Sequence, residues 1–368
     1  MRILLLSDSN SPHTLRWAKS IRNCNNTVGI FSLHTPDPAL YRDTPDINLF
    51  SINASRELQT KDETNISKLI YLRARKKVKQ IIKEFRPDIV HSHYASSYGF
   101  IGALSGFHPY LISLWGGDIF SFPNKSFLYS RILKFSLSKA DKILSTSRVM
   151  KERAQNYTEK KIILTPFGID VERFYPKKIN KYFKQDDIVI GTIKTLEKHY
   201  GIDLLIKAFY LVKNKYPDKP LKLLIVGKGT QREFLENKVK TLGIENDTVF
   251  TGYVDHNNVQ DYHSMIDIYV AMSLTESFGV AVLEASACGR PVVVSNVGGL
   301  PEVVEHEKTG LIVEKENPEK LADALDKLIC NPELMIGMGN EGRNKVIKEY
   351  NWKESVKKMI SIYETIVN

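Results

Sequence analysis

The sequence predicts an α/β protein built from two successive doubly wound domains, each with a parallel sheet. The chain has 368 residues, more than one hydrophobic core usually covers. Short apolar runs alternate with helical patterns, which indicates βαβ units and sheets covered on both faces. The alternation breaks at Thr165–Asp170 and in the polar stretch Lys177–Asp187, and then starts afresh. We therefore expect domains at 1–175 and 176–349, with a C-terminal helix at 350–368.

The first domain begins with an apolar run, a polar loop that contains His13, and a helix that passes through Trp17. Because strands and helices alternate from here on, the apolar runs are expected to lie side by side in one sheet. The predicted strands are Ile3–Leu6, Val28–Phe31, Asp88–His91, Leu111–Leu114, Lys142–Ser145 and Ile162–Leu164.

The second domain repeats the pattern after the boundary, and Ile202–Lys213 is its first predicted helix. Ligands of such folds bind beyond the carboxyl ends of the strands, so loops at those ends are the candidate sites. Residues 332–367 read as helices. The predicted strands are Ile188–Ile193, Leu221–Val226, Val249–Thr251, Ile268–Ala271 and Pro291–Ser295.

Positive charge is concentrated in the first domain. Residues 1–175 hold 26 Lys and Arg against 15 Asp and Glu, so the formal charge of +10 arises there. The densest window, Lys68–Arg86, has apolar residues at helical spacing and predicts an amphipathic helix with a basic outer face. Such a face is either simply solvated or binds an anionic membrane surface. Nucleic acid is not expected, because no zinc-finger or RNP-type motif accompanies the charge.

Several classes of protein are excluded by composition. With 42% apolar and 26% charged residues the chain is globular, and no apolar run approaches the ~20 residues that span a bilayer. The first residues are too short an apolar stretch for a signal peptide. Three separated cysteines make no disulfide framework. These features predict a cytoplasmic protein, and no cluster of residues has the spacing of metal ligands.

The segment Ser273–Ala285 follows a predicted strand and enters a helix. Backbone N–H groups of Phe278, Gly279 and Val280 therefore fall near a helix N-terminus, which favours a phosphate. Glu276 and Glu284 are too far apart to grip one small group, but they can hold hydroxyls on either side of a diphosphate. The alternative is that both are ordinary helix carboxylates.

Two lysines follow the first strand of the second domain. Lys194 and Lys198 are placed to neutralise a diphosphate, although lysines in a loop are often only solvated. No Asp-x-Asp triplet occurs in the sequence, so a site that releases a nucleoside diphosphate would take its positive charge from side chains and helix termini.

These motifs, taken in order, resemble those of the family-4 retaining glycosyltransferases of GT-B architecture. The resemblance covers nearly the whole chain and includes the pair Glu276 and Glu284. The other matching segments are Trp115–Asp118, Pro166–Asp170, Gly191–Gly201, Gly289–Val293 and Gly298–Glu302.

The resemblance implies two facing Rossmann-like domains, the first for the acceptor and the second for a nucleotide-sugar donor. A helix from Trp352 onward would cross back to the first domain. The implied reaction is a metal-independent, retaining transfer of a hexose-type sugar from a UDP- or GDP-sugar. The expected acceptor is a hydroxyl of a glycan or lipid-linked molecule in surface polysaccharide or glycolipid synthesis. The positive charge of the first domain suggests that this acceptor is lipid-linked, bears phosphate and lies at the inner membrane face.

Roles follow position by position from this resemblance. Glu276 would meet the donor sugar and Glu284 the ribose. Lys194 and Lys198 would meet the diphosphate, with His199 as the alternative to Lys198 because the spacing is short. The remaining donor-side candidates are Phe278, Gly279, Val280, Gly227 and Val254.

The acceptor side is less defined, because Trp115 stands where many members have a histidine. The polar candidates are Asp118, His13, His91 and His93. Their loops and strand ends lie on the side of the first sheet where ligands bind.

Other readings remain open. The chain could be another GT-B enzyme, such as a disaccharide synthase or a nucleotide-sugar epimerase, or an inactive nucleotide-sugar-binding subunit. An NAD-dependent oxidoreductase is disfavoured, because neither domain's first strand leads into GxGxxG and Gly227–Gly229 is only a fragment of it.

Overall fold

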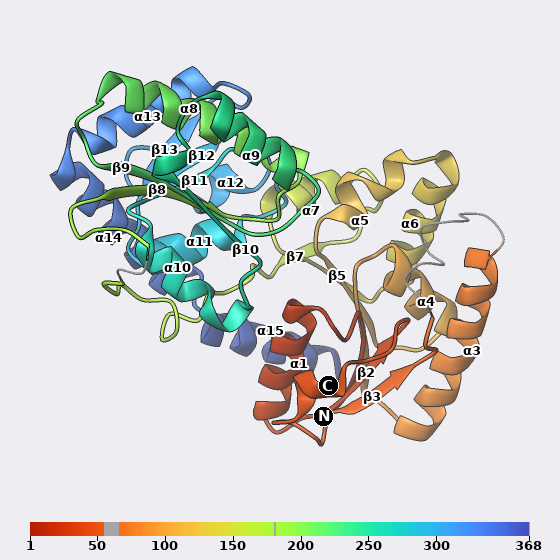
Figure 1. Cartoon of the computed structure of the whole chain (residues 1–368). Coiled ribbons are helices and arrows are strands. Elements are labelled where there is room, and N and C mark those ends of the chain that lie inside the picture. Colours follow the sequence, from red (N-terminus) through yellow and green to blue (C-terminus); the bar gives the residue numbers. More distant parts are fainter. Residues whose placement is uncertain (55–65, 180–181, 368) are drawn as a thin grey trace. The chain divides into compact units, whose positions relative to one another are not determined.

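The computed structural model describes residues 1–54, 66–179 and 182–367 of the chain (Figure 1). The chain forms two compact units, defined by contacts within each. Unit 1 comprises Met1–Pro166 together with Ser355–Asn368, and unit 2 comprises Phe167–Glu354. The predicted boundary at 175/176 thus lies inside unit 2, and the last helix begins in unit 2 and continues as part of unit 1.

Unit 1 is built on a seven-stranded parallel sheet with the order β3-β2-β1-β4-β5-β6-β7. Strands β1, β4 and β5 are almost wholly buried, as expected of a parallel sheet covered on both faces. The strands are β1 (Arg2–Leu6), β2 (Thr27–Ser32), β3 (Asn48–Ser51), β4 (Ile89–His93), β5 (Tyr110–Leu114), β6 (Lys142–Ser145) and β7 (Ile162–Leu164).

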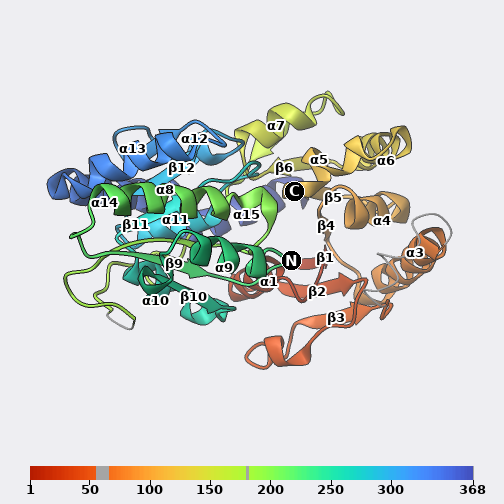
Figure 2. The same cartoon turned by 45° about the horizontal axis from the view of Figure 1, so that its top comes forward.

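Helices cover both faces of this sheet. On one face α3, α4 and α6 lie side by side (Figures 1 and 2), linked by ring contacts of Tyr71 with Phe100 and of Phe100 with Phe135. The opposite face carries α1 and the C-terminal helix α15, whose Tyr363 is fully buried. The helices are α1 (Pro12–Asn23), α3 (Ile66–Phe85), α4 (Ser97–Ser105), α5 (Gly117–Phe120), α6 (Phe127–Lys139), α7 (Arg148–Ala154) and α15 (Trp352–Val367), with short 3-10 turns η1 (Pro38–Tyr41) and η2 (Phe122–Asn124).

Unit 2 has a six-stranded parallel sheet with the order β10-β9-β8-β11-β12-β13. The strands are β8 (Ile188–Ile193), β9 (Leu221–Val226), β10 (Thr248–Gly252), β11 (Ile268–Ala271), β12 (Val292–Ser295) and β13 (Gly310–Val313). The helices are α8 (Ile202–Lys215), α9 (Arg232–Thr241), α10 (Val259–Met265), α11 (Val280–Ala287), α12 (Leu300–Val303), α13 (Pro318–Ile329) and α14 (Pro332–Glu349), with 3-10 turns η3 (Lys198–Tyr200), η4 (Glu245–Asp247) and η5 (His256–Asn258).

The sequence dictates several of these helix starts. The side chains of Asn317 and Asn331 accept hydrogen bonds from the backbone N–H groups of Lys320 and Leu334, and a proline follows each asparagine. Proline fits the first helical turn because its missing N–H would have no partner there. Each Asn-Pro pair therefore begins a helix, α13 and α14 respectively.

The predicted α/β class with two parallel sheets is confirmed. Two edge strands, β3 and β13, were not predicted. β3 is only half-buried and has a polar residue at each end, so it lacks the apolar run that marks the inner strands. None of the helices in the described ranges is both long and apolar enough to cross a bilayer.

Candidate active site

The order of the strands places a binding edge in each unit. In unit 1 the order in which successive strands are added to the sheet switches sides between β1 and β4. In unit 2 it switches between β8 and β11. Crevices at the carboxyl ends of such strand pairs are where ligands bind in open α/β sheets. Within unit 2, Lys194 follows β8 and Glu276 lies beyond β11. Within unit 1, His13 follows β1 and His93 ends β4.

Lys194 and Glu276 form a close ion pair in unit 2. The Lys194 Nζ lies 2.6 Å from Glu276 Oε2, and the two side chains are only 12% and 14% exposed. Burial disfavours the charged lysine, but the nearby Glu276 carboxylate outweighs it and raises the pKa of Lys194 above its usual range. The ammonium also lies 4.7 Å from the centre of the Tyr200 ring. Unit 2 thus holds a fixed cation beside a fixed carboxylate at the switch point.

Glycines let the loops after β11 and β12 approach each other closely beside this pair. Gly298 has φ +51°, and a β-carbon there would lie 1.8 Å from the backbone oxygen of Glu276. The Gly299 N–H donates to that same oxygen at 3.0 Å. Gly279 caps α11 with φ +107°, and a side chain on it would press on Leu300. Val282 and Leu283 donate the first hydrogen bonds of α11, both to the Gly279 carbonyl. The N–H groups of Val280 and Ala281 precede these bonds, and the start of a helix favours an anion.

Buried side chains of β11 and α10 surround Glu284. The Tyr269 hydroxyl of β11 donates to the backbone oxygen of Ile193 at 3.3 Å, and burial raises the pKa of Tyr269 to about 12. Its ring lies 5.4 Å from that of His263 on α10, and His263 Nε2 lies 3.4 Å from Glu284 Oε2. His263 is fully buried and Glu284 almost so. Glu284 is therefore not an exposed surface carboxylate of its helix.

Sequence reasoning missed Tyr200, Tyr269 and His263. Tyr200 lies on η3 in the loop after β8, whereas Tyr269 and His263 fall within ordinary apolar patterns of β11 and α10 and gain polar neighbours only on folding. The one available signal was His263 itself, a histidine on the apolar side of α10. The same pattern is produced by a hydrogen-bonded histidine of the core that has no role in binding.

The other predicted donor-side residues lie on neighbouring loops. Lys198 and His199 are exposed on η3, and neither forms a hydrogen bond or ion pair with Lys194 or Glu276. Gly227 has φ +143° where its loop passes the backbone oxygen of Lys194, so no side chain fits there. Val254 is half-buried after β10, beside the exposed Tyr253, whose ring lies 4.7 Å from the Lys228 ammonium. Phe278 is buried against Phe167 and Tyr350.

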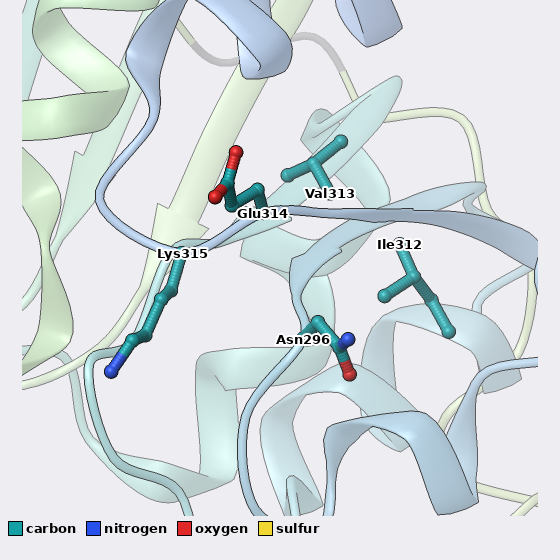
Figure 3. A pocket seen from close by; sticks show the side chains of 5 residues that line it. All are labelled: Asn296, Ile312, Val313, Glu314 and Lys315. Carbon is teal, nitrogen blue, oxygen red and sulfur yellow. The ribbon is translucent and has the colours of Figure 1, made fainter.

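A shallow hollow lies elsewhere on unit 2, beyond β12 and β13 (Figure 3). It is lined by Asn296 and residues 312–315, and none of the predicted site residues takes part in it. The strand order does not switch sides between β12 and β13, so this hollow does not lie at the expected binding site. Among the described residues, no three His, Cys, Asp or Glu side chains gather as metal ligands.

In unit 1 the two histidines of β4 belong to a buried hydrogen-bond network. His91 Nδ1 lies 2.7 Å from the Tyr363 hydroxyl of α15, and its Nε2 lies 2.8 Å from the Ser113 hydroxyl. His93 Nδ1 lies 3.0 Å from the Ser7 hydroxyl. Both histidines are buried, and His93 stacks on Trp115 with ring centres 4.1 Å apart. The hydroxyls of Tyr363 and Ser113 were not predicted to take part.

Trp115 is the centre of the aromatic surroundings of these histidines. Its ring is also in edge contact with the rings of His13 and Tyr94. Asp118, fully buried, holds the loop in place: its carboxylate accepts N–H groups of Ala95 and Gly116 at 2.8 Å and of Trp115 at 3.3 Å. Burial raises the pKa of Asp118 and these amides oppose the shift. Asp118 therefore positions Trp115, whereas His13 is exposed on the first turn of α1.

We expect the folded state to lose stability as the pH falls from about 6.5 towards 5. Burial lowers the pKa of His91 to about 3 and that of His93 well below 6.5, so both stay neutral when folded while the unfolded chain binds protons. The loss is about 1.4 kcal/mol per pH unit for each histidine. Most carboxylates titrate below this window. Denaturant unfolding of the wild type and His91→Gln measures it, because glutamine keeps hydrogen bonds but does not titrate. An equally steep dependence in His91→Gln would contradict the assignment.

Models of glycosyltransferase families match both units. The model described as Glycosyl transferases group 1 matches residues 174–345, and the model described as Glycosyl transferase 4-like matches residues 2–147. Fold, site and these matches together define a glycosyltransferase of the GT-B class. The chain belongs to the group 1, family-4-like glycosyltransferases, and the predicted enzyme class is confirmed.

Similar proteins include named enzymes of this class. The N-acetyl-alpha-D-glucosaminyl L-malate synthase of Bacillus anthracis is 28% identical over 302 residues, 79% of this chain and 77% of that protein. A GDP-mannose-dependent alpha-(1-6)-phosphatidylinositol monomannoside mannosyltransferase of Mycolicibacterium smegmatis is 31% identical over 201 residues, 51% of this chain and 52% of that protein.

Solved structures share the fold over the whole chain. Sucrose-phosphate synthase of Thermosynechococcus elongatus matches with a TM-score of 0.84 and 21% identity, over 99% of this chain and 98% of that one. HepE of Anabaena, in complex with UDP, matches with a TM-score of 0.80 and 16% identity, over 99% of this chain and 100% of that one. These matches bear out the predicted GT-B architecture.

Proposed function

We propose that the protein is a metal-independent, retaining hexosyltransferase that uses a UDP- or GDP-sugar and acts on a hydroxyl of a glycan or lipid-linked acceptor. The observation that carries the proposal is the Lys194–Glu276 pair, which occupies the switch point of unit 2 beside the start of α11. A cation and helix N–H groups at this edge suit a diphosphate, and a neighbouring carboxylate suits sugar hydroxyls.

The donor roles follow from this arrangement and from the family. Lys194, together with Lys198 or His199, neutralises the diphosphate, and the N–H groups of Gly279 and Val280 add to it. Glu276 accepts hydrogen bonds from the sugar, and Glu284, backed by His263, does so from the ribose. Phe278, Gly227 and Val254 shape the parts of the donor site that hold the diphosphate and the base. In the reaction the bond between the sugar and the diphosphate breaks, a bond from the sugar to the acceptor oxygen forms, and the proton of the acceptor hydroxyl passes to the leaving diphosphate. The cations and the N–H groups of α11 stabilise the charge that develops on the leaving oxygens.

Unit 1 takes the acceptor in this proposal. His13, His93 and Trp115 present rings near the switch point, with His91 and Asp118 holding them in place. We place the protein in the cytoplasm, at the inner membrane face when the acceptor is lipid-linked, with the basic helix α3 toward the anionic lipids. A relative named for phosphatidylinositol monomannoside supports a lipid-linked acceptor.

A soluble acceptor is the second candidate, since another relative is named as an L-malate synthase. Product analysis separates the two: transfer to small hydroxy acids or free sugars favours the soluble acceptor, and transfer into organic-extractable glycolipid favours the lipid-linked one. Thermal unfolding with UDP-, GDP- and ADP-sugars identifies the donor, because a ligand that binds only the folded state raises its apparent stability.

We expect turnover with the matching donor to be unchanged when divalent cations are removed with EDTA. The positive charge that stabilises the leaving diphosphate comes from Lys194, from Lys198 or His199, and from the start of α11. A chelator removes none of these groups. The rate is measured as release of nucleoside diphosphate before and after chelation. A loss of activity that magnesium restores would overturn the metal-independent site.

A further inference from the structure

We infer that unit 1 carries a membrane-insertion surface in which the exposed residues Phe127 and Leu128 enter the lipid headgroup region of an anionic bilayer. This inference rests on the lipid-linked acceptor proposed above and adds the residues that contact the lipid. We call the surface the α3–α6 face. It is formed by the exposed side chains of residues 70–85 of α3 and of α6, together with Lys125 just before α6.

The apolar part of the α3–α6 face is its most unusual feature. Phe127 is 78% exposed and Leu128 is 61% exposed, both on the first turn of α6, and Leu72 on α3 is 59% exposed. Large apolar side chains gathered in one region of a soluble surface commonly mark an interaction site. Tyr71 of α3 and Phe135 of α6 both contact the ring of Phe100 on α4, so the two helices are joined through α4 in one helical layer. The three exposed side chains therefore lie on the same layer of unit 1.

The charged part of the face lies around Phe127 and Leu128, which we call the apolar tip, and its charge is almost entirely positive. No acidic residue occurs between Asp118 and Asp141, a stretch that contains the whole of α6, and Glu84 is the one acid of α3. Several basic residues of this face form no ion pair with a carboxylate of the described part of the chain. On the α3 side they are Arg73, Lys76, Lys79, Lys83 and Arg86, and on α6 they are Arg131, Lys134 and Lys139.

The side chains at the tip are arranged as at a membrane interface. The Arg131 guanidinium lies 5.8 Å from the centre of the Phe127 ring, and the Lys125 ammonium lies 6.0 Å from that of Tyr129. Long basic side chains can keep their charge at headgroup level while an adjacent ring sits deeper. Along α3, Leu72, Lys76, Lys79, Lys83 and Arg86 recur at helical spacing and form one stripe. A flat anionic surface complements such a stripe without a specific pocket.

The test compares binding to vesicles of phosphatidylcholine with and without phosphatidylglycerol, by sedimentation of the full chain at low and high salt. Wild type is expected to bind the anionic vesicles. The double variant Phe127→Ser, Leu128→Ser is expected to bind at least about tenfold more weakly, including at high salt where the apolar contribution persists. Lys79→Glu, Lys83→Glu is expected to lose at least about tenfold at low salt and much less at high salt.

Phe234→Ser is the matched control. Phe234 is also an exposed phenylalanine with a lysine ammonium over its ring, but it lies on α9 of unit 2, where acidic residues accompany the basic ones, so vesicle binding is expected to be unchanged. Thermal shift with the donor checks that unit 2 is intact and tests the proposed function separately. Three results would overturn the inference while donor binding persists. They are absence of wild-type vesicle binding, wild-type binding by the double variant, and light scattering that shows Phe127 and Leu128 to mediate self-association instead.

Discussion

Replacement of Glu276 by Gln is expected to lower kcat/KM about 10²–10³-fold, a loss typical of removing one electrostatic contact to the transition state. The change keeps the size of the side chain but removes the charge that faces Lys194 at 2.6 Å. In the proposed site Glu276 holds the sugar rather than the nucleotide. Binding of UDP or GDP without the sugar, measured by thermal shift, is therefore expected to stay within about threefold of wild type, which amounts to less than 1 kcal/mol.

Lys194→Ala completes this experiment, because it is expected to lower turnover and nucleotide binding together. Lys194 is the buried cation of the pair and would contact the diphosphate in both substrate and product. Since the two residues touch, their effects should not add, and the double variant should be closer to the worse single variant than to the sum of both free energies.

Glu314→Gln is a suitable control for these variants. Glu314 is an exposed carboxylate after β13, on the rim of the hollow in Figure 3 and at the same edge of the sheet. Its replacement is expected to leave kcat/KM unchanged. If Glu276→Gln turned over at the wild-type rate, the assignment of unit 2 as the catalytic donor site would be wrong; if it lost nucleotide binding as well, Glu276 would act on the diphosphate side through Lys194.

The inner strands could be predicted from the sequence because they are nearly continuous apolar runs. β6, β8, β9 and β11 begin and end where the sequence predicts, and so does β7 at the edge of its sheet. The edge strands β3 and β13 were not predicted. β3 has a polar residue at each end and is partly exposed, so its pattern does not mark a strand and its pairing is decided by the neighbouring strand. β13 does contain an apolar run, at residues 311–313, which the sequence analysis did not assign.

The site was predictable to the extent that its residues lie in motifs at strand ends. Lys194, Glu276 and the glycines around them fall into this class. The contacts of His91 with Tyr363 could not be predicted, because they join residues 272 positions apart and depend on α15 packing on the sheet of unit 1. Tyr269 and His263 are similar: their sequence patterns are those of a buried strand and a buried helix face, and polar partners appear only after folding.

Gly298→Ala is expected to abolish most activity while leaving the protein folded. A β-carbon at position 298 would lie 1.8 Å from the backbone oxygen of Glu276, so the loop that carries this carboxylate has to move. The hydrogen bond from the Gly299 N–H to the same oxygen would be disturbed too. A displacement of about 1 Å at a catalytic group can cost about 10²-fold in rate, and we expect a loss of that order in kcat.

Stability should change far less than activity. The positive φ of Gly298 and the local shift together are expected to cost about 1–3 kcal/mol, measured by denaturant unfolding. Nucleotide binding should largely persist, because Lys194 is held from the other side by hydrogen bonds of its loop to Val226 and Lys228.

Gly337→Ala provides the comparison, since Gly337 is exposed on α14, has nothing within 4 Å of its would-be β-carbon and has no positive φ. That variant should keep full activity and gain about 0.5–1 kcal/mol, as alanine is the better helix former. Equal activity of the two alanine variants would show that the Glu276 loop adapts freely. The close approach of Gly298 would then have no catalytic purpose, and the reactive geometry would have to be set by other contacts of Glu276, chiefly that with Lys194.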